Sequence, residues 1–190
     1  MKNTGLGKII LLNGASSSGK STLCDALQKQ LAEPFLRFSL DFLMFNSNVL
    51  PERRDEEGLF SWRAIRPKLF QGYYNCLSGL AMAGNNVLVD YIFESEEQLH
   101  YLVNCLSELD VFLVGVHCPL KELERRENQR GDRNIGEVQE DFKTVHTFTT
   151  YDFDIDSTQP PEVNAKTIIS AWRMRSYPSV FNLLATKNTT

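Results

Sequence analysis

Short apolar runs alternate along the chain with segments in which apolar residues recur every three or four positions. The runs predict buried strands, and the recurrence predicts amphipathic helices. Strands that alternate with helices are typical of a parallel sheet with crossover helices. We expect five strands, at residues 8–12, 35–40, 86–93, 111–117 and 152–155. We expect helices at residues 21–31, 62–83, 96–107, 120–129, 136–149 and 162–174.

The loop after the first predicted strand reads NGASSSGKST, at residues 13–22. Its glycines and serines alone would predict only a flexible turn. Four of its residues, however, have the full spacing G-x-x-x-x-G-K-[ST] of a phosphate-binding loop, or P-loop: Gly14, Gly19, Lys20 and Ser21. The order of strand, loop and helix directs the positive end of the helix at bound phosphates. The loop therefore predicts a nucleotide-binding site.

Each part of this loop has an expected role. Backbone amides would surround the phosphates, because the glycines carry no side chain that would keep an anion away. The Lys20 ammonium would reach the β- and γ-phosphates, and the Ser21 hydroxyl would bind Mg²⁺. The loop residues that we expect to bind ATP are Gly14, Ala15, Ser16, Ser17, Ser18, Gly19, Lys20, Ser21 and Thr22.

Composition limits the alternatives. With 190 residues, of which 42% are hydrophobic, the chain suits one domain over residues 1–190. A net charge of −4 argues against a broad nucleic-acid-binding surface. The cysteines form no C-x-x-C pair and the histidines no cluster, so we expect reduced core cysteines and no zinc site. No apolar stretch approaches the ~20 residues of a membrane span, and no signal peptide is evident, so we expect a cytoplasmic protein.

Three aspartates follow or end predicted strands, where parallel sheets place their chemistry. Asp90 ends the hydrophobic run NVLVD, a pattern typical of the aspartate that holds Mg²⁺ directly or through water. Asp41 follows the second strand and is either a helix cap or a functional carboxylate. Asp156 closes the fifth strand, and the Ser-Thr pair after it favours a cap or a turn.

A basic cluster lies in the segment LKELERRENQRGDR, at residues 120–133. Arg125 fits a solvated helix face. Arg126, Arg130 and Arg133 lie about one helical turn apart and end where a glycine breaks the helix. Arginines over a triphosphate stabilise the charge that spreads over the transferring phosphoryl group. We therefore expect a short arginine-bearing lid at about residues 120–136.

Missing motifs narrow the class of P-loop protein. The chain has no N-K-x-D motif that would read guanine, and its D-x-x-G at residues 55–58 does not follow a strand. Tyr91 stands where a motor or transporter ATPase would usually carry an acid. What remains is a kinase that transfers the γ-phosphate to a bound acceptor rather than to water.

An ordered set of motifs resembles the chloramphenicol phosphotransferases, P-loop kinases that phosphorylate an antibiotic hydroxyl. The motifs are IILLNGASSSGKST, EPFLRFSLDFL, LDVFLVGVHC and RENQRGDR, followed by VH, YDFDID and AW. The resemblance implies a fold like that of nucleoside-monophosphate kinases, with sheet order 2-3-1-4-5 and helices on both faces. It implies that Asp41 is the general base and that Arg130 and Arg133 are lid arginines. It also implies that Arg126 stacks on adenine, opposite residues 158–161.

The chain departs from this family in two places. The family tends to carry a second acid after the Asp90 position, where this chain has Tyr91. Residues 42–74 match no family motif, although an acceptor pocket is expected at about residues 41–75. This stretch is strongly aromatic, which fits either core packing or an acceptor pocket: Phe42, Phe45, Phe60, Trp62, Phe70, Tyr73 and Tyr74. Residues 46–61 read as a lid, a substrate-binding loop or a plain surface loop.

The sequence thus predicts Mg²⁺-ATP-dependent phosphorylation of a hydroxyl on a small molecule, with chloramphenicol or a related antibiotic as the candidate acceptor. The predicted catalytic residues are Asp41, Lys20, Arg130 and Arg133, and the predicted Mg²⁺ site is Ser21 with Asp90. A nucleotide or nucleoside kinase is the alternative within this class. A catalytically silent nucleotide-binding module that acts through a partner is the alternative outside it.

Overall fold

Five strands form one sheet in the computed structural model, which describes residues 5–46, 48–130 and 136–187. The strand order is β2-β3-β1-β4-β5, and every neighbouring pair is parallel, which confirms the predicted order. The strands are β1 (Lys8–Asn13), β2 (Phe35–Arg37), β3 (Asn86–Tyr91), β4 (Asp110–His117) and β5 (Phe153–Asp156). β1 lies at the centre, so the loop that follows it emerges between β3 and β4.

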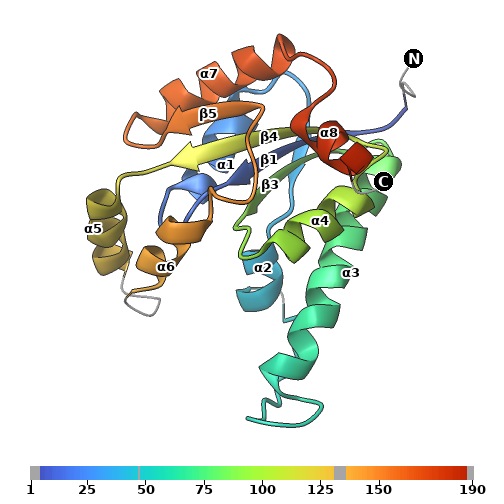
Figure 1. Cartoon of the computed structure of the whole chain (residues 1–190), viewed down its shortest axis with the longest axis vertical. Coiled ribbons are helices and arrows are strands. Elements are labelled where there is room, and N and C mark those ends of the chain that lie inside the picture. Colours follow the sequence, from blue (N-terminus) through green and yellow to red (C-terminus); the bar gives the residue numbers. More distant parts are fainter. Residues whose placement is uncertain (1–4, 47, 131–135, 188–190) are drawn as a thin grey trace.

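Helices cover both faces of the sheet (Figure 1). One face packs against α1 (Lys20–Gln30) and α7 (Pro161–Arg173). The other packs against α3 (Trp62–Met82), α4 (Glu96–Cys105) and α8 (Val180–Lys187). The described residues form three further helices: α2 (Leu40–Phe45), α5 (Leu120–Arg130) and α6 (Glu137–Thr144). In Figure 1 these three lie toward the carboxyl ends of the strands, where the functional residues gather.

The apolar side chains of β1 alternate between the two layers. Ile9 and Leu11 pack with α3, α4 and α8, whereas Ile10 and Leu12 pack with α1 and α7. All four are fully buried. A central parallel strand that is covered on both faces reads as a continuous apolar run, which is why the sequence KIILL predicted it correctly.

Several predicted boundaries were wrong. The strand predicted at residues 35–40 ends at Arg37, because β2 is an edge strand that pairs over three residues with β3, and Leu40 then begins α2. The helix predicted at 136–149 ends at Thr144, and the side chain of Asn13 binds the next carbonyl, that of Val145. The helix α8 was not predicted; its Phe181 is buried against the α3 and α4 layer.

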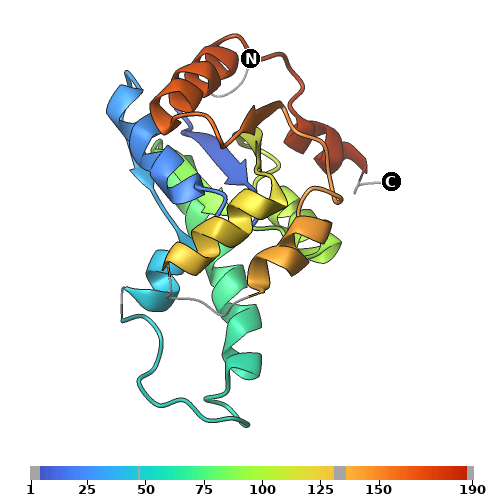
Figure 2. The same ribbon diagram turned by 90° about the vertical axis from the view of Figure 1, so that its left-hand side faces the viewer.

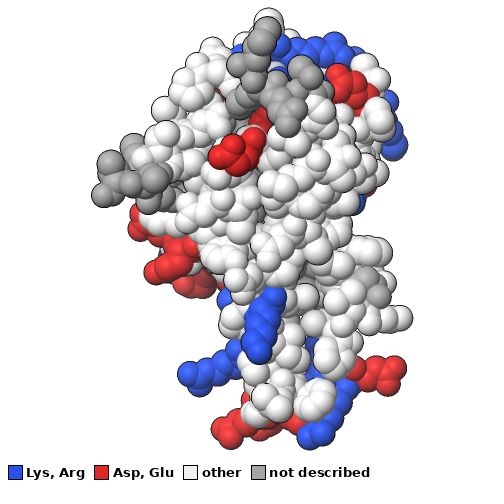
Figure 3. All heavy atoms as spheres, turned by 90° about the vertical axis from the view of Figure 1, so that its right-hand side faces the viewer, with Lys and Arg blue, Asp and Glu red and all other residues white. Residues whose placement is uncertain are grey.

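The loop before α3 extends away from the sheet (Figure 2). Most of its described residues, 48–61, are exposed, and none of them lines the cavity of about 470 Å³ beside the P-loop. Figure 3 shows charged side chains of both signs at this end of the molecule, where Arg53, Arg54 and Glu57 are exposed. The loop therefore favours the surface-loop interpretation over a lid.

The cysteines differ in their burial. Cys24 and Cys118 are buried and free, but Cys76 is exposed, so the prediction of a core position was wrong for that residue. Within the described ranges, no three or more His, Cys, Asp or Glu side chains are placed to hold a metal ion. In the same ranges, no helix is both long and apolar enough to cross a membrane.

Candidate active site

The P-loop connects the end of β1 to the first turn of α1. Gly14 lies so close to β4 that a Cβ atom there would stand 2.6 Å from the carbonyl oxygen of Val116. Gly19 has a φ of 91°, a left-handed conformation that glycine adopts without strain. No side chain of the described residues caps the start of α1, so its first backbone amides remain available for an anion. Both glycines of the motif are thus required by the backbone.

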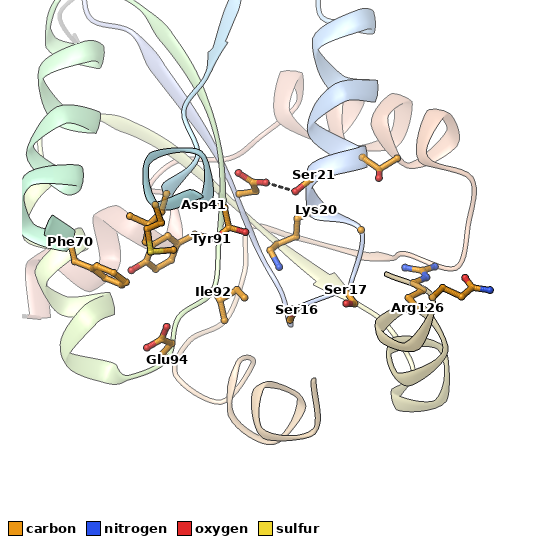
Figure 4. Close-up of a pocket in the computed structure, with 16 residues that line it drawn as sticks. Ser16, Ser17, Lys20, Ser21, Asp41, Phe70, Tyr91, Ile92, Glu94 and Arg126 are labelled. Carbon is orange, nitrogen blue, oxygen red and sulfur yellow. Dashed lines mark hydrogen bonds between the residues drawn. The ribbon is translucent and has the colours of Figure 1, made fainter. Parts of the chain in front are cut away.

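Lys20 folds back across the loop that precedes it. Its Nζ donates hydrogen bonds of 2.7 Å to the carbonyl oxygens of Gly14 and Ala15, and the side chain is largely buried. Figure 4 shows its ammonium pointing toward Ser16, along the inner side of the loop. The positive charge is therefore held at the place where phosphates are expected.

Ser21 and Asp90 meet beside the P-loop. The Ser21 Oγ donates a 2.7 Å hydrogen bond to Asp90 Oδ2, drawn as the dashed line in Figure 4. Asp90 is paired in register with Leu12 of β1, which explains why it reaches the start of α1. Its Oδ1 is buried and has no hydrogen-bond partner among the residues that the structure describes. A hydroxyl, a carboxylate and one unused carboxylate oxygen fit Mg²⁺, which takes oxygen ligands and retains several waters.

Arg37 completes this cluster and was missed by the sequence analysis. It lies in β2 and contacts Asp90 Oδ2 at 3.2 Å and Asp25 Oδ1 at 2.6 Å. The signal that could have found it is the strand order, since a side chain at the end of β2 must lie next to β3. The guanidinium offsets the negative charge of Asp90, whose side chain is only 6% exposed.

A cavity of about 470 Å³ joins the P-loop to Asp41. In Figure 4, Asp41, Tyr91, Phe70, Ile92 and Glu94 lie on one side of the cavity and Arg126 on the other, with Lys20 and Ser16 between them. Two apolar residues of α2 also line the cavity: Leu40 and Met44. One cavity thus contains a phosphate-binding loop, a carboxylate and an apolar wall.

Asp41 does not cap α2. The N-cap is Ser39, and Asp41 lies in the first helical turn, so the cap interpretation of this residue was wrong. A carboxylate in the first turn is favoured by the helix dipole. Because Asp41 lines the cavity, its side chain is placed for a role there.

Phe70 alone among the predicted aromatic acceptor residues lines this cavity. Tyr73 and Tyr74 are buried in the core, whereas Phe42 and Phe45 on α2 are exposed. Phe70 is also buried in the core, so core packing explains three of the seven, whereas Phe42, Phe45 and Trp62 are exposed.

Tyr91 stands at the position where the family tends to carry a second acid. It lines the cavity, and its hydroxyl contacts that of Tyr74. Burial raises the pKa of Tyr91 well above its ordinary value, so the hydroxyl stays protonated. Tyr91 thus contributes a neutral wall to the cavity in place of a carboxylate.

Arg126 links the P-loop to the loop after β5. Its Nη1 donates to the Ser18 carbonyl at 3.2 Å, its Nη2 to the Ser157 carbonyl at 2.9 Å, and its Nε to Glu122 Oε1 at 2.7 Å. Hydrogen bonds from Arg125 and Arg126 lower the pKa of Glu122 to about 2. A second cavity, of about 350 Å³, lies between Arg126 and residues Ser157, Thr158, Gln159, Pro160 and Pro161. The predicted position of Arg126 at a nucleotide-binding surface fits this arrangement.

The other predicted lid residues are only partly covered by the structure. Arg130 is the last residue of α5, and nothing is described of its side chain. Arg133 lies outside the described residues. Arg125 makes an exposed pair with Glu122, as expected for a solvated helix face. The prediction that Arg130 and Arg133 act on the phosphoryl group stays a prediction.

Two buried polar residues that the sequence analysis did not consider fix α6 beside the P-loop. Glu127 of α5 accepts hydrogen bonds from the amides of Gly136 and Val138, at the start of α6. Asn13 donates to the carbonyl of Val145, just after the end of α6, at 2.9 Å. Asn13 was visible in the sequence as the residue before the P-loop; Glu127 offered no signal within a charged helix.

A polar network continues from Asn13 into the residues after α6. Tyr151 accepts a 2.8 Å hydrogen bond from Asn13, and its hydroxyl lies 2.6 Å from His146 Nδ1. His146 stacks on His117, whose Nε2 lies 2.6 Å from Asp154 Oδ1. Burial and the neighbouring His117 lower the pKa of His146 to about 4. His146 is therefore neutral at pH 7. The network includes His146 of the VH motif and Tyr151 and Asp154 of the YDFDID motif.

Asp156 forms a turn, one of its two predicted roles. Its Oδ1 accepts a 2.8 Å hydrogen bond from the Thr158 amide, and this bond lowers the pKa of the carboxyl. The turn shapes the loop that borders the second cavity.

Sequence comparison assigns the family. The profile of the family "Chloramphenicol phosphotransferase-like protein" matches residues 7–173. Two proteins of Mycobacterium tuberculosis, from strains CDC 1551 and H37Rv, both carry the name "Putative O-phosphotransferase". Each is 30% identical to this chain over 198 residues, covering 94% of this chain and 88% of its own length.

Solved structures agree with this assignment at the level of the fold. The Mycobacterium tuberculosis APS kinase CysC, in complex with AMPPNP and APS, superposes with a TM-score of 0.67 at 20% identity, covering 88% of this chain and 98% of its own. The shikimate kinase of Aquifex aeolicus gives a TM-score of 0.56 at 19% identity, covering 87% and 96%. The fold is that of the P-loop kinases, and the chain belongs to the chloramphenicol phosphotransferase-like family.

Proposed function

We propose that this protein is an ATP-dependent phosphotransferase that transfers the γ-phosphate to a hydroxyl of a small molecule. The observation that carries the proposal is the single cavity of about 470 Å³ that contains both the P-loop and Asp41. Phosphoryl transfer depends mainly on positioning and on charge stabilisation, and this cavity offers groups for both.

The P-loop binds the phosphates of ATP in this proposal. Amides of residues 15–20 hold the phosphate oxygens, and the Lys20 ammonium exchanges its carbonyl partners for β- and γ-phosphate oxygens. Ser21 and Asp90 would hold Mg²⁺, directly or through water. Magnesium held there would supply positive charge that offsets the negative charge of the phosphates. The adenine would bind between Arg126 and the loop after β5.

Asp41 takes the role of general base. Its carboxylate accepts the proton of the acceptor hydroxyl while that oxygen attacks the γ-phosphorus. Arg130 and Arg133 stabilise the negative charge of the transferring group in this scheme. The position of Asp41 supports this role, because Asp41 lines the same cavity as Lys20 and is not the N-cap of α2.

The lining of the cavity indicates what kind of acceptor fits. Leu40, Met44, Phe70, Tyr91 and Ile92 provide an apolar surface around Asp41. Such a surface suits a molecule with an apolar or aromatic body that presents a hydroxyl to the carboxylate. Chloramphenicol or a related antibiotic has this character and is our candidate acceptor. Because ATP is the proposed donor, we place the reaction in the cytoplasm.

An acceptor screen tests this proposal. ADP formation is measured with Mg²⁺-ATP and, in turn, chloramphenicol, other hydroxyl-bearing antibiotics, nucleosides and sugars, and mass spectrometry identifies any phosphorylated product. We expect acceptor-dependent ADP formation with an antibiotic of the chloramphenicol type. Turnover of a nucleoside or nucleotide instead would contradict the proposed acceptor class, and ATP binding without any transfer would contradict the proposed activity.

A further inference from the structure

A carboxylate of the protein itself contacts the P-loop. Asp141 Oδ2 accepts a 2.8 Å hydrogen bond from the backbone amide of Ser16, although the two residues lie 125 positions apart in the sequence. Backbone amides of a P-loop are the groups that bind phosphate oxygens. A negatively charged side chain thus uses one amide of a loop that is built to bind anions.

Ser16 lies at the end of the P-loop where transfer would take place. It lines the cavity that contains Asp41, whereas Ser18 lines the second cavity, next to Ser157. In Figure 4, Lys20 points toward Ser16, on the side of the loop away from Arg126. Since the γ-phosphate must be the phosphate nearest the acceptor, Asp141 stands next to the position that the γ-phosphate takes.

The fold holds Asp141 in this place. Asp141 lies on α6, whose start is bound by the buried carboxylate of Glu127. The chain just beyond α6 is bound by Asn13, the residue that directly precedes the P-loop. Both ends of this short helix are hydrogen-bonded to elements that flank the active site. The fold therefore positions the helix so that Asp141 contacts Ser16.

We propose that Asp141 occupies the γ-phosphate end of the P-loop in the nucleotide-free protein and is displaced by ATP. This inference rests on the proposed function. The carboxylate and the γ-phosphate carry like charges, so their repulsion weakens the binding of ATP. ADP has no γ-phosphate and avoids most of this repulsion. Asp141 therefore lowers the affinity for ATP more than the affinity for ADP. It returns to the Ser16 amide once the γ-phosphate has been transferred.

The variant Asp141→Asn separates the charge from the hydrogen bond, because the amide oxygen of asparagine still accepts from Ser16. Titration calorimetry measures the binding of Mg²⁺ with a non-hydrolysable ATP analogue and, separately, with ADP. We expect the affinity for the ATP analogue to rise about tenfold or more, and that for ADP to change by less than about threefold. Inorganic tripolyphosphate and pyrophosphate, as probes without a base, should show the same contrast.

Glu140→Gln is the matched control. Glu140 is the neighbouring residue on α6, is exposed and pairs with Lys143, so this variant removes the same charge without touching the P-loop. We expect it to leave both affinities within about twofold of the wild type, since exposed charges at this separation are largely screened by salt. An equal gain in Glu140→Gln would show a general charge effect and would overturn the proposal.

Other outcomes also contradict the proposal. An unchanged or weaker affinity of Asp141→Asn for the ATP analogue would mean that Asp141 supports nucleotide binding instead of opposing it. Equal gains for ATP analogue and ADP would place the carboxylate away from the γ-phosphate. If the wild-type protein binds neither ATP nor tripolyphosphate, the proposed function fails as well. If it binds both, and Lys20→Ala weakens this binding, a missing gain in Asp141→Asn contradicts this inference alone.

Discussion

Replacing Lys20 with alanine tests the part of the active site on which every later step depends. In the structure, Lys20 Nζ donates two hydrogen bonds of 2.7 Å, to the carbonyls of Gly14 and Ala15. We expect the same ammonium to exchange these carbonyls for phosphate oxygens when ATP binds, because bonds between two charged groups are the stronger ones. The variant removes the ammonium but leaves the backbone amides of the loop in place.

The geometry limits the size of the effect. A hydrogen bond to a charged group is worth about 1.5–3 kcal/mol, which corresponds to roughly 10- to 150-fold in affinity. The wild-type protein must give up both carbonyl contacts before Lys20 can reach the phosphates. These lost contacts offset part of the gain, so we expect the lower part of that range, an affinity for ATP that falls about 10- to 30-fold.

Titration calorimetry with Mg²⁺ and a non-hydrolysable ATP analogue measures this change. Lys29→Ala provides the control, because Lys29 is exposed in the last turn of the same helix, and its loss changes the net charge equally. We expect the melting temperature of Lys20→Ala to move by no more than about 4 °C, the shift that corresponds to about 1 kcal/mol in a protein of this size. Unchanged affinity in Lys20→Ala, or an equal loss in Lys29→Ala, would refute the reasoning.

Two further predictions concern the metal site and the polar network. Asp90→Asn should raise the Mg²⁺ concentration needed for half-maximal ATP binding about 10- to 100-fold, because it removes the carboxylate charge beside Ser21. A Mg²⁺ titration at fixed nucleotide concentration that shows no change would contradict the metal site. His146 has a folded-state pKa of about 4 against an ordinary 6.5, so the unfolded chain binds more protons and stability falls as the pH drops from 6.5 toward 4. Melting curves of wild type and His146→Gln across this window should diverge below pH 6.5, and parallel curves would show that His146 is not buried in its neutral form.

Much of the sheet could be predicted from the sequence because its strands are apolar runs buried on both faces. The apolar runs of β1 and β4 predicted these strands correctly. The P-loop motif located the end of the first strand and the start of the first helix. Their order in the sheet came from resemblance to a family, since neighbours in a parallel sheet are not neighbours in sequence. The predicted β2 was too long, because an edge strand of three residues gives no periodic signal that marks its end.

The candidate site was predictable only where a motif fixes the spacing. Lys20, Ser21 and Asp90 lie on local patterns, and the structure brings them together. The contact between Ser16 and Asp141 spans 125 residues, and that between Arg37 and Asp90 spans 53. Asp141 and Arg37 look like ordinary surface charges in the sequence. Only the fold shows that such residues meet at the P-loop.

The most direct test of the central claim compares phosphoryl transfer by the wild type and Asp41→Asn. The acceptor is the one that the screen identifies, the donor is γ-labelled ATP, and the rate of label transfer is measured beside the affinity for ATP. Asparagine keeps the size of the side chain, and Ser39 rather than Asp41 is the N-cap of α2, so the helix should be retained. Our account predicts that turnover falls by about 10²- to 10⁴-fold while ATP affinity stays near the wild-type value. Full transfer activity in Asp41→Asn would contradict the account, because the acceptor proton would then be taken by another group.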